Sequence, residues 1–136
     1  MHKSLFSILV LFFLVGCSPS CFDQSGLYLS AIEPILVRWD DAKLLASSTP
    51  RSRVAGSISD LQSIKREVES LSVPDCATPA QIILVEYMDL KIAAFLGFLA
   101  KNDDEDVSTA NYKAKIKLAE FTKEMEKLKA GKAPYN

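Results

Sequence analysis

The sequence predicts an all-α protein, an up-down-up-down four-helix bundle that follows a cleaved signal peptide. Three observations support this fold class. Apolar residues recur at spacings of three and four over four long stretches, which is the period of an α-helix. No stretch alternates apolar and polar residues for long enough to indicate a strand. The breaks between the stretches are short, so we expect sequential helices to be antiparallel neighbours.

The size and composition fit one domain with one core. The chain has 136 residues, of which 49 % are hydrophobic and 24 % are charged. This length is typical of a single domain. Sixteen basic and 17 acidic side chains give a formal net charge of −1. A nearly neutral chain has no electrostatic footprint for nucleic acid, so we expect no nucleic-acid partner.

The amino-terminal residues 1–17 have the pattern of an export signal. A short basic start precedes an apolar run at 5–15. This run is too short to span a membrane, which takes about 20 residues, and has the length of a signal-peptide apolar region. The next residues, Leu14-Val15-Gly16-Cys17, resemble the lipobox of bacterial lipoproteins. An ordinary secretory signal cut elsewhere, with Cys17 a plain thiol, is the alternative.

The resemblance to lipoproteins implies a lipid anchor. Residues 1–16 would be removed, and Cys17 would carry a diacylglyceryl group and an acylated amino terminus. Two or more acyl chains anchor a protein stably, whereas one chain is marginal. We therefore expect an exported protein, anchored through Cys17 to a membrane and facing the periplasm or the cell exterior. Ser18, which is not Asp, resembles the pattern for outer-membrane sorting in a Gram-negative host.

The remaining cysteines, Cys21 and Cys76, are expected to form a disulfide. An even pair in an oxidising compartment favours a bridge over the alternative of two thiols. Closing a loop of about 55 residues would stabilise the fold by about 4 kcal/mol. Cys21 lies four residues after Cys17, which is at most about 14 Å of chain. A bridge at Cys21 would thus hold the domain close to the membrane.

The helical domain is predicted to occupy residues 27–136, after a lipidated cysteine and short polar tether at 17–26. Pro34 lies within the first helix, predicted from Leu27 to Ser47, and indicates a kink or a restart. Apolar residues at helical spacing define the buried side of this helix: Leu29, Ile32, Leu36, Trp39, Ala42 and Leu45.

The second helix has the clearest amphipathic pattern. Thr49 is predicted to cap it, with Pro50 at the first helical position. Its apolar residues form one narrow stripe, which is typical of a surface helix with one buried side. The stripe consists of Val54, Ile58, Leu61, Ile64, Val68 and Leu71.

The last two helices are predicted on either side of a polar loop at 102–108. Thr78 and Gln81 form an expected capping box at the start of the third helix, which runs to about Lys101. Gly131 is expected to end the fourth helix. The apolar residues of the fourth helix are Ala114, Leu118, Phe121, Met125 and Leu128.

The third helix has more apolar residues than one buried side needs. A core stripe comprises Leu84, Val85, Met88, Ile92, Phe95, Leu96 and Leu99. A second stripe, here called the seam, comprises Ile83, Tyr87, Leu90, Ala94 and Phe98. Either the seam is an exposed surface for a partner, or the third helix is the most buried helix of the bundle. The second interpretation is the simpler one.

The chain after the signal has few of the residue patterns that catalysis or metal binding requires. It has no histidine, which excludes imidazole-based triads, di-iron Glu-x-x-His pairs and His zinc sites. The acidic run at 103–106 lacks the glycine and glutamate of a calcium loop, and favours instead a helix amino terminus. Glu86 and Asp89 are candidates for an acid/base pair, or for partners of cations on neighbouring helices. We expect no enzyme activity, metal or cofactor.

These observations predict a lipid-anchored cell-envelope protein with a non-enzymatic role. It would be a protein-interaction or accessory module for an envelope protein partner. The alternative is a carrier of a small apolar ligand within the bundle interior. The residues expected to line that interior are Trp39, Met88, Phe95 and Phe121.

Overall fold

The computed structural model describes residues 21–131, and these residues form four packed α-helices. The described part of the chain contains no strand, which confirms the all-α class. Two short 3₁₀ turns, η1 and η2, precede the second and third helices. The elements in chain order are α1 (Cys21–Ser48), η1 (Arg51–Arg53), α2 (Val54–Ser70), η2 (Asp75–Ala77), α3 (Thr78–Ala100) and α4 (Asp104–Ala130).

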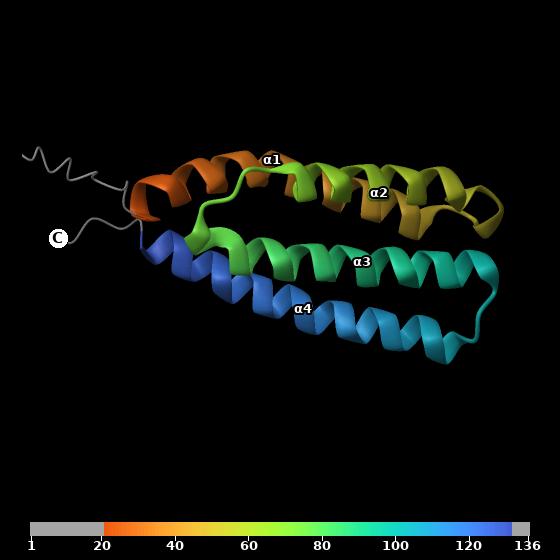
Figure 1. Ribbon diagram of the computed structural model, residues 1–136. Coiled ribbons are helices and arrows are strands. Elements are labelled where there is room, and N and C mark those ends of the chain that lie inside the picture. Colours follow the sequence, from red (N-terminus) through yellow and green to blue (C-terminus); the bar gives the residue numbers. More distant parts are fainter. Residues whose placement is uncertain (1–20, 132–136) are drawn as a thin grey trace, which may run out of the picture.

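The elongated molecule has two distinct ends (Figure 1). At one end a disulfide joins Cys21, the first residue of α1, to Cys76 in η2. The carboxyl-terminal end of α4 lies at the same end of the molecule. At the other end, Arg51 of η1 lies over the ring of Phe98, near the end of α3. We call these the disulfide end and the distal end.

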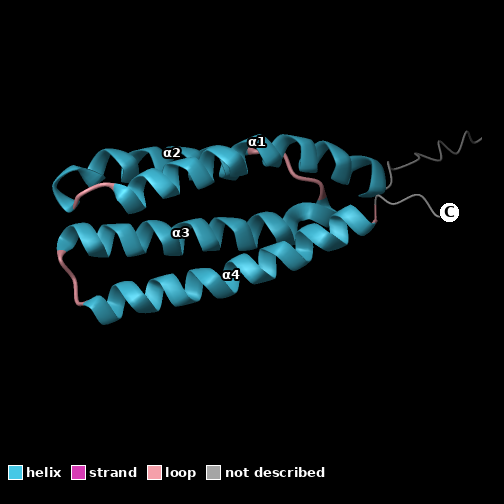
Figure 2. Ribbon diagram, turned by 180° about the vertical axis from the view of Figure 1, so that it is seen from behind, coloured by secondary structure: helices cyan, strands magenta, loops and turns pink. Residues whose placement is uncertain are grey.

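The four helices do not pack equally against one another. The most extensive contact is between α3 and α4, and α2 packs against both α1 and α3. The contact between α1 and α4 is small. Figure 2 shows α3 and α4 side by side along much of their length. The α1–α4 side is therefore the least closed side of the molecule.

Helix α1 begins earlier than the sequence pattern predicts. Residues 21–26, assigned to the tether, form its first turns. Ser25 and Tyr28 are buried on the inner face, and the disulfide holds Cys21 against η2. The helix continues through exposed Pro34, so there is no restart. The rest of the predicted tether, residues 17–20, lies outside the described residues.

The buried side of α1 differs partly from the predicted stripe. Its buried apolar residues are Tyr28, Ile32, Ile35, Trp39 and Ala46. Ile32 and Trp39 are as predicted, whereas Leu45 is 56 % exposed and Ala46 takes the inner position. The pattern was ambiguous there because three consecutive residues, 44–46, are apolar.

The predicted caps of α2 and α3 are wrong, because a 3₁₀ turn precedes each helix. The amide of Arg53 donates to the carbonyl of Pro50, and the amide of Ala77 to that of Pro74. Neither helix has a hydrogen bond from a capping side chain. The turn thus takes over the early backbone bonds. It moves the start of α2 downstream to Val54, whereas α3 begins at Thr78, the residue predicted as its cap.

The side chains predicted to cap have other partners. The Thr49 hydroxyl donates to the carbonyl of Leu45 at 2.6 Å, within the last turn of α1. Gln81 Nε2 donates to the carbonyl of Val68 at 2.7 Å. Gln81 therefore joins the start of α3 to the end of α2.

The connection between α3 and α4 is shorter than predicted. Lys101 ends α3 in the left-handed conformation (φ 58°), and the amide of Asn102 donates to the carbonyl of Gly97 at 3.0 Å. Helix α4 then begins at Asp104, so most of the predicted loop at 102–108 is helical. Acidic residues 104–106 occupy the first turn, where the helix dipole favours negative charge. Gly131 follows the last residue of α4, as predicted.

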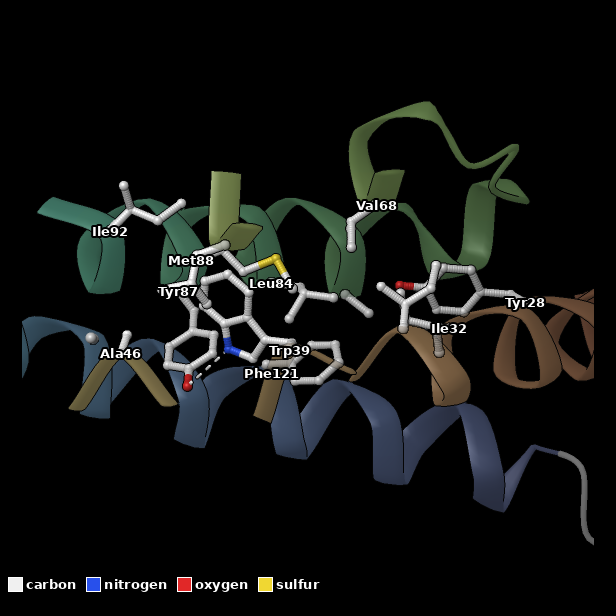
Figure 3. Close-up of a cluster of buried hydrophobic side chains, with 14 of the residues drawn as sticks. Tyr28, Ile32, Trp39, Ala46, Val68, Leu84, Tyr87, Met88, Ile92 and Phe121 are labelled. Carbon is white, nitrogen blue, oxygen red and sulfur yellow. Dashed lines mark hydrogen bonds between the residues drawn. The ribbon is translucent and has the colours of Figure 1, made fainter. Parts of the chain in front are cut away.

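The core runs along the bundle between the four helices. The predicted stripe of α2 is confirmed: Val54, Ile58, Leu61 and Val68 are buried, and Ile64 and Leu71 are partly buried against them. Figure 3 shows Trp39 of α1 beside Tyr87 of α3, with Phe121 of α4 nearby. Leu118, predicted to be buried, is 40 % exposed. Side chains from separate helices thus meet in one core.

Candidate functional site

The disulfide is the feature nearest in sequence to the predicted lipidation site. Cys21 and Cys76 are bonded, and their Cα atoms are 6.0 Å apart. Cys17 lies outside the described residues. Because η2 contacts α1, α3 and α4, this covalent bond fixes the start of α1 to a turn that touches much of the bundle.

The five seam residues of α3 fall into two groups. Tyr87 is buried, and Ile83 and Leu90 are partly buried against the core. Their environment agrees with the interpretation of α3 as a highly buried helix. Ala94 and Phe98 instead line a groove at the distal end, where Phe98 is 37 % exposed. Only the carboxyl-terminal part of the seam therefore adjoins open space.

Tyr87 is part of a polar cluster inside the bundle. Its ring lies edge-on to Trp39, with the centroids 6.0 Å apart. Its hydroxyl accepts hydrogen bonds from Trp39 Nε1 and Lys43 Nζ, both at 3.4 Å (Figure 3 shows the first). Lys43 also donates to Asp40 at 2.6 Å. Burial alone would lower the pKa of Lys43, but the hydrogen bonds to Asp40 and Tyr87, together with the charges of these two groups, raise it.

The distal groove, as we call it, lies between the end of α1 and the facing parts of α3 and α4. Its volume is about 260 Å³. It is open to solvent on the side where α1 and α4 make little contact. Its lining is apolar except for Ser47, Lys91 and Asn111. The complete lining is Ala46, Ser47, Lys91, Ala94, Phe95, Phe98, Val107 and Asn111.

Lys91 gives the distal groove its charge. Its ammonium donates to Asn111 Oδ1 at 2.6 Å and lies 5.5 Å from the centre of the Phe95 ring. Asn111 is held in turn by a bond from Nδ2 to the carbonyl of Val107 at 3.1 Å. Burial, and then the nearby charge of Lys43, lower the pKa of Lys91. No carboxylate among residues 21–131 pairs with Lys91.

Arg51 adds a second cation beside the groove. Its guanidinium carbon is 4.5 Å from the centre of the Phe98 ring, a cation–π geometry. Arg51 likewise has no carboxylate partner within the described residues. The sequence analysis identified neither cation as a site residue. Lys91 could have been noticed in the sequence, because it interrupts the apolar run of α3. Arg51 could not, because only the tertiary fold brings it to Phe98.

The candidate acid/base pair on α3 is divided between two neighbouring helices. Asp89 accepts a hydrogen bond from Lys65 of α2 at 2.6 Å. Glu86 pairs with Lys117 of α4 at 2.9 Å. These bonds raise the pKa values of Lys65 and Lys117. The two carboxylates thus make interhelical ion pairs, which was the structural alternative.

The residues expected to line a ligand cavity are largely packed against the core. Trp39, Met88 and Phe121 are buried. None of them lines the four cavities described for residues 21–131, and Phe95 lines only the distal groove. Apolar groups packed in this way stabilise the fold by close contact.

A wider groove lies at the disulfide end, between α1 and the chain leading into η2. Its volume is about 530 Å³, and its lining includes Leu27, Tyr28 and Val73. Tyr28 is 2 % exposed, and its hydroxyl has no hydrogen-bond partner among residues 21–131. Burial raises the pKa of Tyr28 to about 12.

Within residues 21–131, no cluster of three or more His, Cys, Asp or Glu side chains has metal-binding geometry. In the same range, none of the helices combines the length and apolar character that a membrane crossing requires. No family model matches the chain, and no curated protein or solved structure shows significant similarity to it. The geometry of the two ends is therefore the basis for any functional conclusion.

Proposed function

We propose that the protein is a lipid-anchored cell-envelope protein and that its helices form an up-down-up-down bundle with an interaction or accessory role. The observation that carries this proposal is the spacing of Cys17 and Cys21. Cys17 follows an apolar run in a pattern resembling a lipobox, and Cys21 begins α1. Only residues 18–20 separate a lipid on Cys17 from the disulfide.

This spacing determines which end of the domain is tethered to the membrane. Four residues reach at most about 14 Å, so a lipid on Cys17 would hold the disulfide end near the membrane. Helix α1 has 28 residues, which corresponds to a length of about 42 Å. The distal end would therefore face away from the membrane, toward the periplasm or the cell exterior. A non-enzymatic role fits the chemistry, because the candidate carboxylates of α3 already pair with lysines.

The lipid itself is tested by mass spectrometry of the protein from its native host. The expected amino-terminal peptide of the membrane fraction begins at Cys17 and carries the mass of a diacylglyceryl group and an additional acyl chain. Cys17→Ser should abolish both the lipid and cleavage before residue 17. The double variant Cys21→Ser and Cys76→Ser should keep the lipid. An unmodified Cys17, or a mature chain beginning elsewhere, would contradict the proposal.

The interaction role is tested by crosslinking in cells. We expect the lipidated protein to crosslink to one envelope protein, and the Cys17→Ser variant to lose that crosslink. A cellular activity that persists unchanged after Cys17→Ser would show that the anchor does not serve the role proposed here.

A further inference from the structure

The distal groove combines an apolar floor with positive charge that is not neutralised. The floor is made by Ala94 and by the rings of Phe95 and Phe98. Lys91 is half-buried at the groove and hydrogen-bonds to a neutral amide, not to a carboxylate. Charged side chains that lose solvent are usually paired within the protein. Within the described residues, Lys91 and Arg51 are thus two cations at the groove without a carboxylate partner.

The charges around the groove are unevenly distributed. Lys43, whose charge acts on Lys91, is paired with Asp40. Arg51 lies over the Phe98 ring. The nearest acidic run, residues 103–106, is at the first turn of α4, and Val107 and Asn111 of the same helix line the groove. The Lys91 side of the groove is thus its cationic side.

The place of the groove in the bundle restricts what can reach it. Ala46 is 25 residues beyond Cys21 on α1, which is about 37 Å along a helix axis. Headgroups of a membrane that holds the disulfide end do not extend this far. The volume of about 260 Å³ is below the roughly 300–1,000 Å³ typical of small-molecule pockets. It suits one or two side chains of a larger partner.

We propose that the distal groove binds an acidic peptide segment of a partner protein, with a carboxylate on Lys91 and an adjacent apolar side chain on Ala94 and Phe98. Charge complementarity carries this choice: the groove offers a partly desolvated ammonium, an aromatic surface and an amide oriented by its bond to the Val107 carbonyl. Hydrogen bonds between an ammonium and a carboxylate are stronger than those between neutral groups. The proposal deepens the proposed interaction role by assigning it a place and a partner chemistry.

The test selects binders from a displayed library of random dodecapeptides. The target is the full chain purified as the cell makes it and held in lipid nanodiscs. We expect the selected peptides to be enriched in Asp or Glu beside an aromatic or aliphatic residue. Lys91→Met should weaken their binding by at least about tenfold. Lys113→Met, which removes an exposed lysine of α4 outside the groove, should leave binding within about twofold.

A second pair of variants tests the groove without changing its charge. Ser47→Trp places a large ring in the groove, whereas Ser48→Trp places it on the same helix outside the lining. Both serines are exposed and donate to carbonyls of the preceding turn of α1, so the two substitutions have similar local effects. Ser47→Trp should abolish peptide binding, and Ser48→Trp should not. Circular dichroism confirms that each variant is folded.

Three results would overturn this assignment. One is a set of selected peptides without acidic enrichment. Another is binding that Lys91→Met and Ser47→Trp leave unchanged. The third is tight, Lys91-dependent binding of dodecanoate with no binding of the acidic peptides, which would identify the groove as a fatty-acid site. If the natural chain purified from cells carries no lipid and still binds the peptides, the anchor is contradicted and the groove assignment is supported.

Discussion

The disulfide end and the distal end of the bundle are held together by different forces. At the disulfide end, a covalent bond joins α1 to η2, and Gln81 joins α3 to the end of α2. At the distal end, the contact between η1 and α3 includes the Arg51–Phe98 cation–π pair. A groove with an unneutralised lysine lies beside this contact. The comparison shows that the end nearest the predicted anchor is covalently fixed, whereas the opposite end retains unsatisfied charge.

Removing the disulfide should have the largest effect on stability. Cys21→Ser combined with Cys76→Ser should lower the free energy of unfolding by about 4 kcal/mol, because the unfolded chain gains the freedom of a loop of 55 residues. Urea unfolding measures the loss. Amide hydrogen exchange should accelerate most in the first turns of α1. Equal acceleration at the distal end would show that the two ends do not differ as described.

Tyr28 provides a pH-dependent test at the disulfide end. Its pKa in the folded state is raised from 10.0 to about 12, so the unfolded chain loses this proton at lower pH than the folded chain does. Protonated Tyr28 thus makes its full contribution to the stability of the folded state below pH 10. This contribution is lost as the pH rises through about 12. At about pH 12 the free energy of unfolding should have fallen by roughly 2–3 kcal/mol for this reason.

Tyr28→Phe should remove this pH dependence. At neutral pH the variant should be as stable as the natural chain or about 1 kcal/mol more stable, because the deleted hydroxyl is buried without a partner. Unfolding curves at a series of pH values compare the two proteins, and the lysine ion pairs are common to both. Parallel losses of stability up to about pH 12 would mean that Tyr28 is not buried as in this structure.

Two glycines near the distal end should respond differently to alanine. A Cβ on Gly56 meets nothing within 4 Å, so Gly56→Ala should raise the free energy of unfolding by about 0.5–1 kcal/mol. A Cβ on Gly97 would be 3.2 Å from Val107 Cγ2, where α3 and α4 approach closely. Gly97→Ala should therefore stabilise less than Gly56→Ala or destabilise. Thermal unfolding of both variants measures the difference, and equal gains would show that the helices are not in close contact there.

The interhelical ion pairs should have the smallest effects. Asp89→Asn and Glu86→Gln each remove a pair with a lysine, Lys65 and Lys117 respectively. Exposed pairs of this kind contribute about 0.2–1 kcal/mol and weaken as salt is added. Urea unfolding at low and high salt checks both properties. A loss above about 2 kcal/mol from either substitution would require a role for the carboxylate beyond pairing.

The helices differ in how far their sequence predicted their structure. The buried side of helix α2 was predicted correctly because its apolar residues form one stripe with polar residues elsewhere, although its start was not. Helix α3 is apolar on most sides, so periodicity could not separate the core position of Tyr87 from the groove position of Phe98. The start of α1 was missed because residues 21–26 are mainly polar and small. The first residue of this segment, Cys21, is held by a disulfide to Cys76, which is distant in the sequence, so local periodicity does not reveal it.

The candidate site was predicted in part for similar reasons. Sequence reasoning placed Ala94 and Phe98 in a possible interaction surface, and the structure places both in the distal groove. It did not find Lys91 and Arg51 as groove cations, because whether a cation is paired depends on which helices surround it. The caps were predicted wrongly because neither the Thr-Pro pair at 49–50 nor the Thr-x-x-Gln pattern at 78–81 reveals a 3₁₀ turn at the start of the helix.

Paramagnetic broadening measures which end of the lipidated bundle lies near the membrane. The lipidated chain is held in nanodiscs whose lipid headgroups carry a spin label, and amide NMR signals are compared with those in unlabelled nanodiscs. We predict strong broadening at residues 75–77 of η2 and none at residues 46–51 or 97–102. Broadening that is strongest at the distal residues, or equal at both ends, would contradict the account.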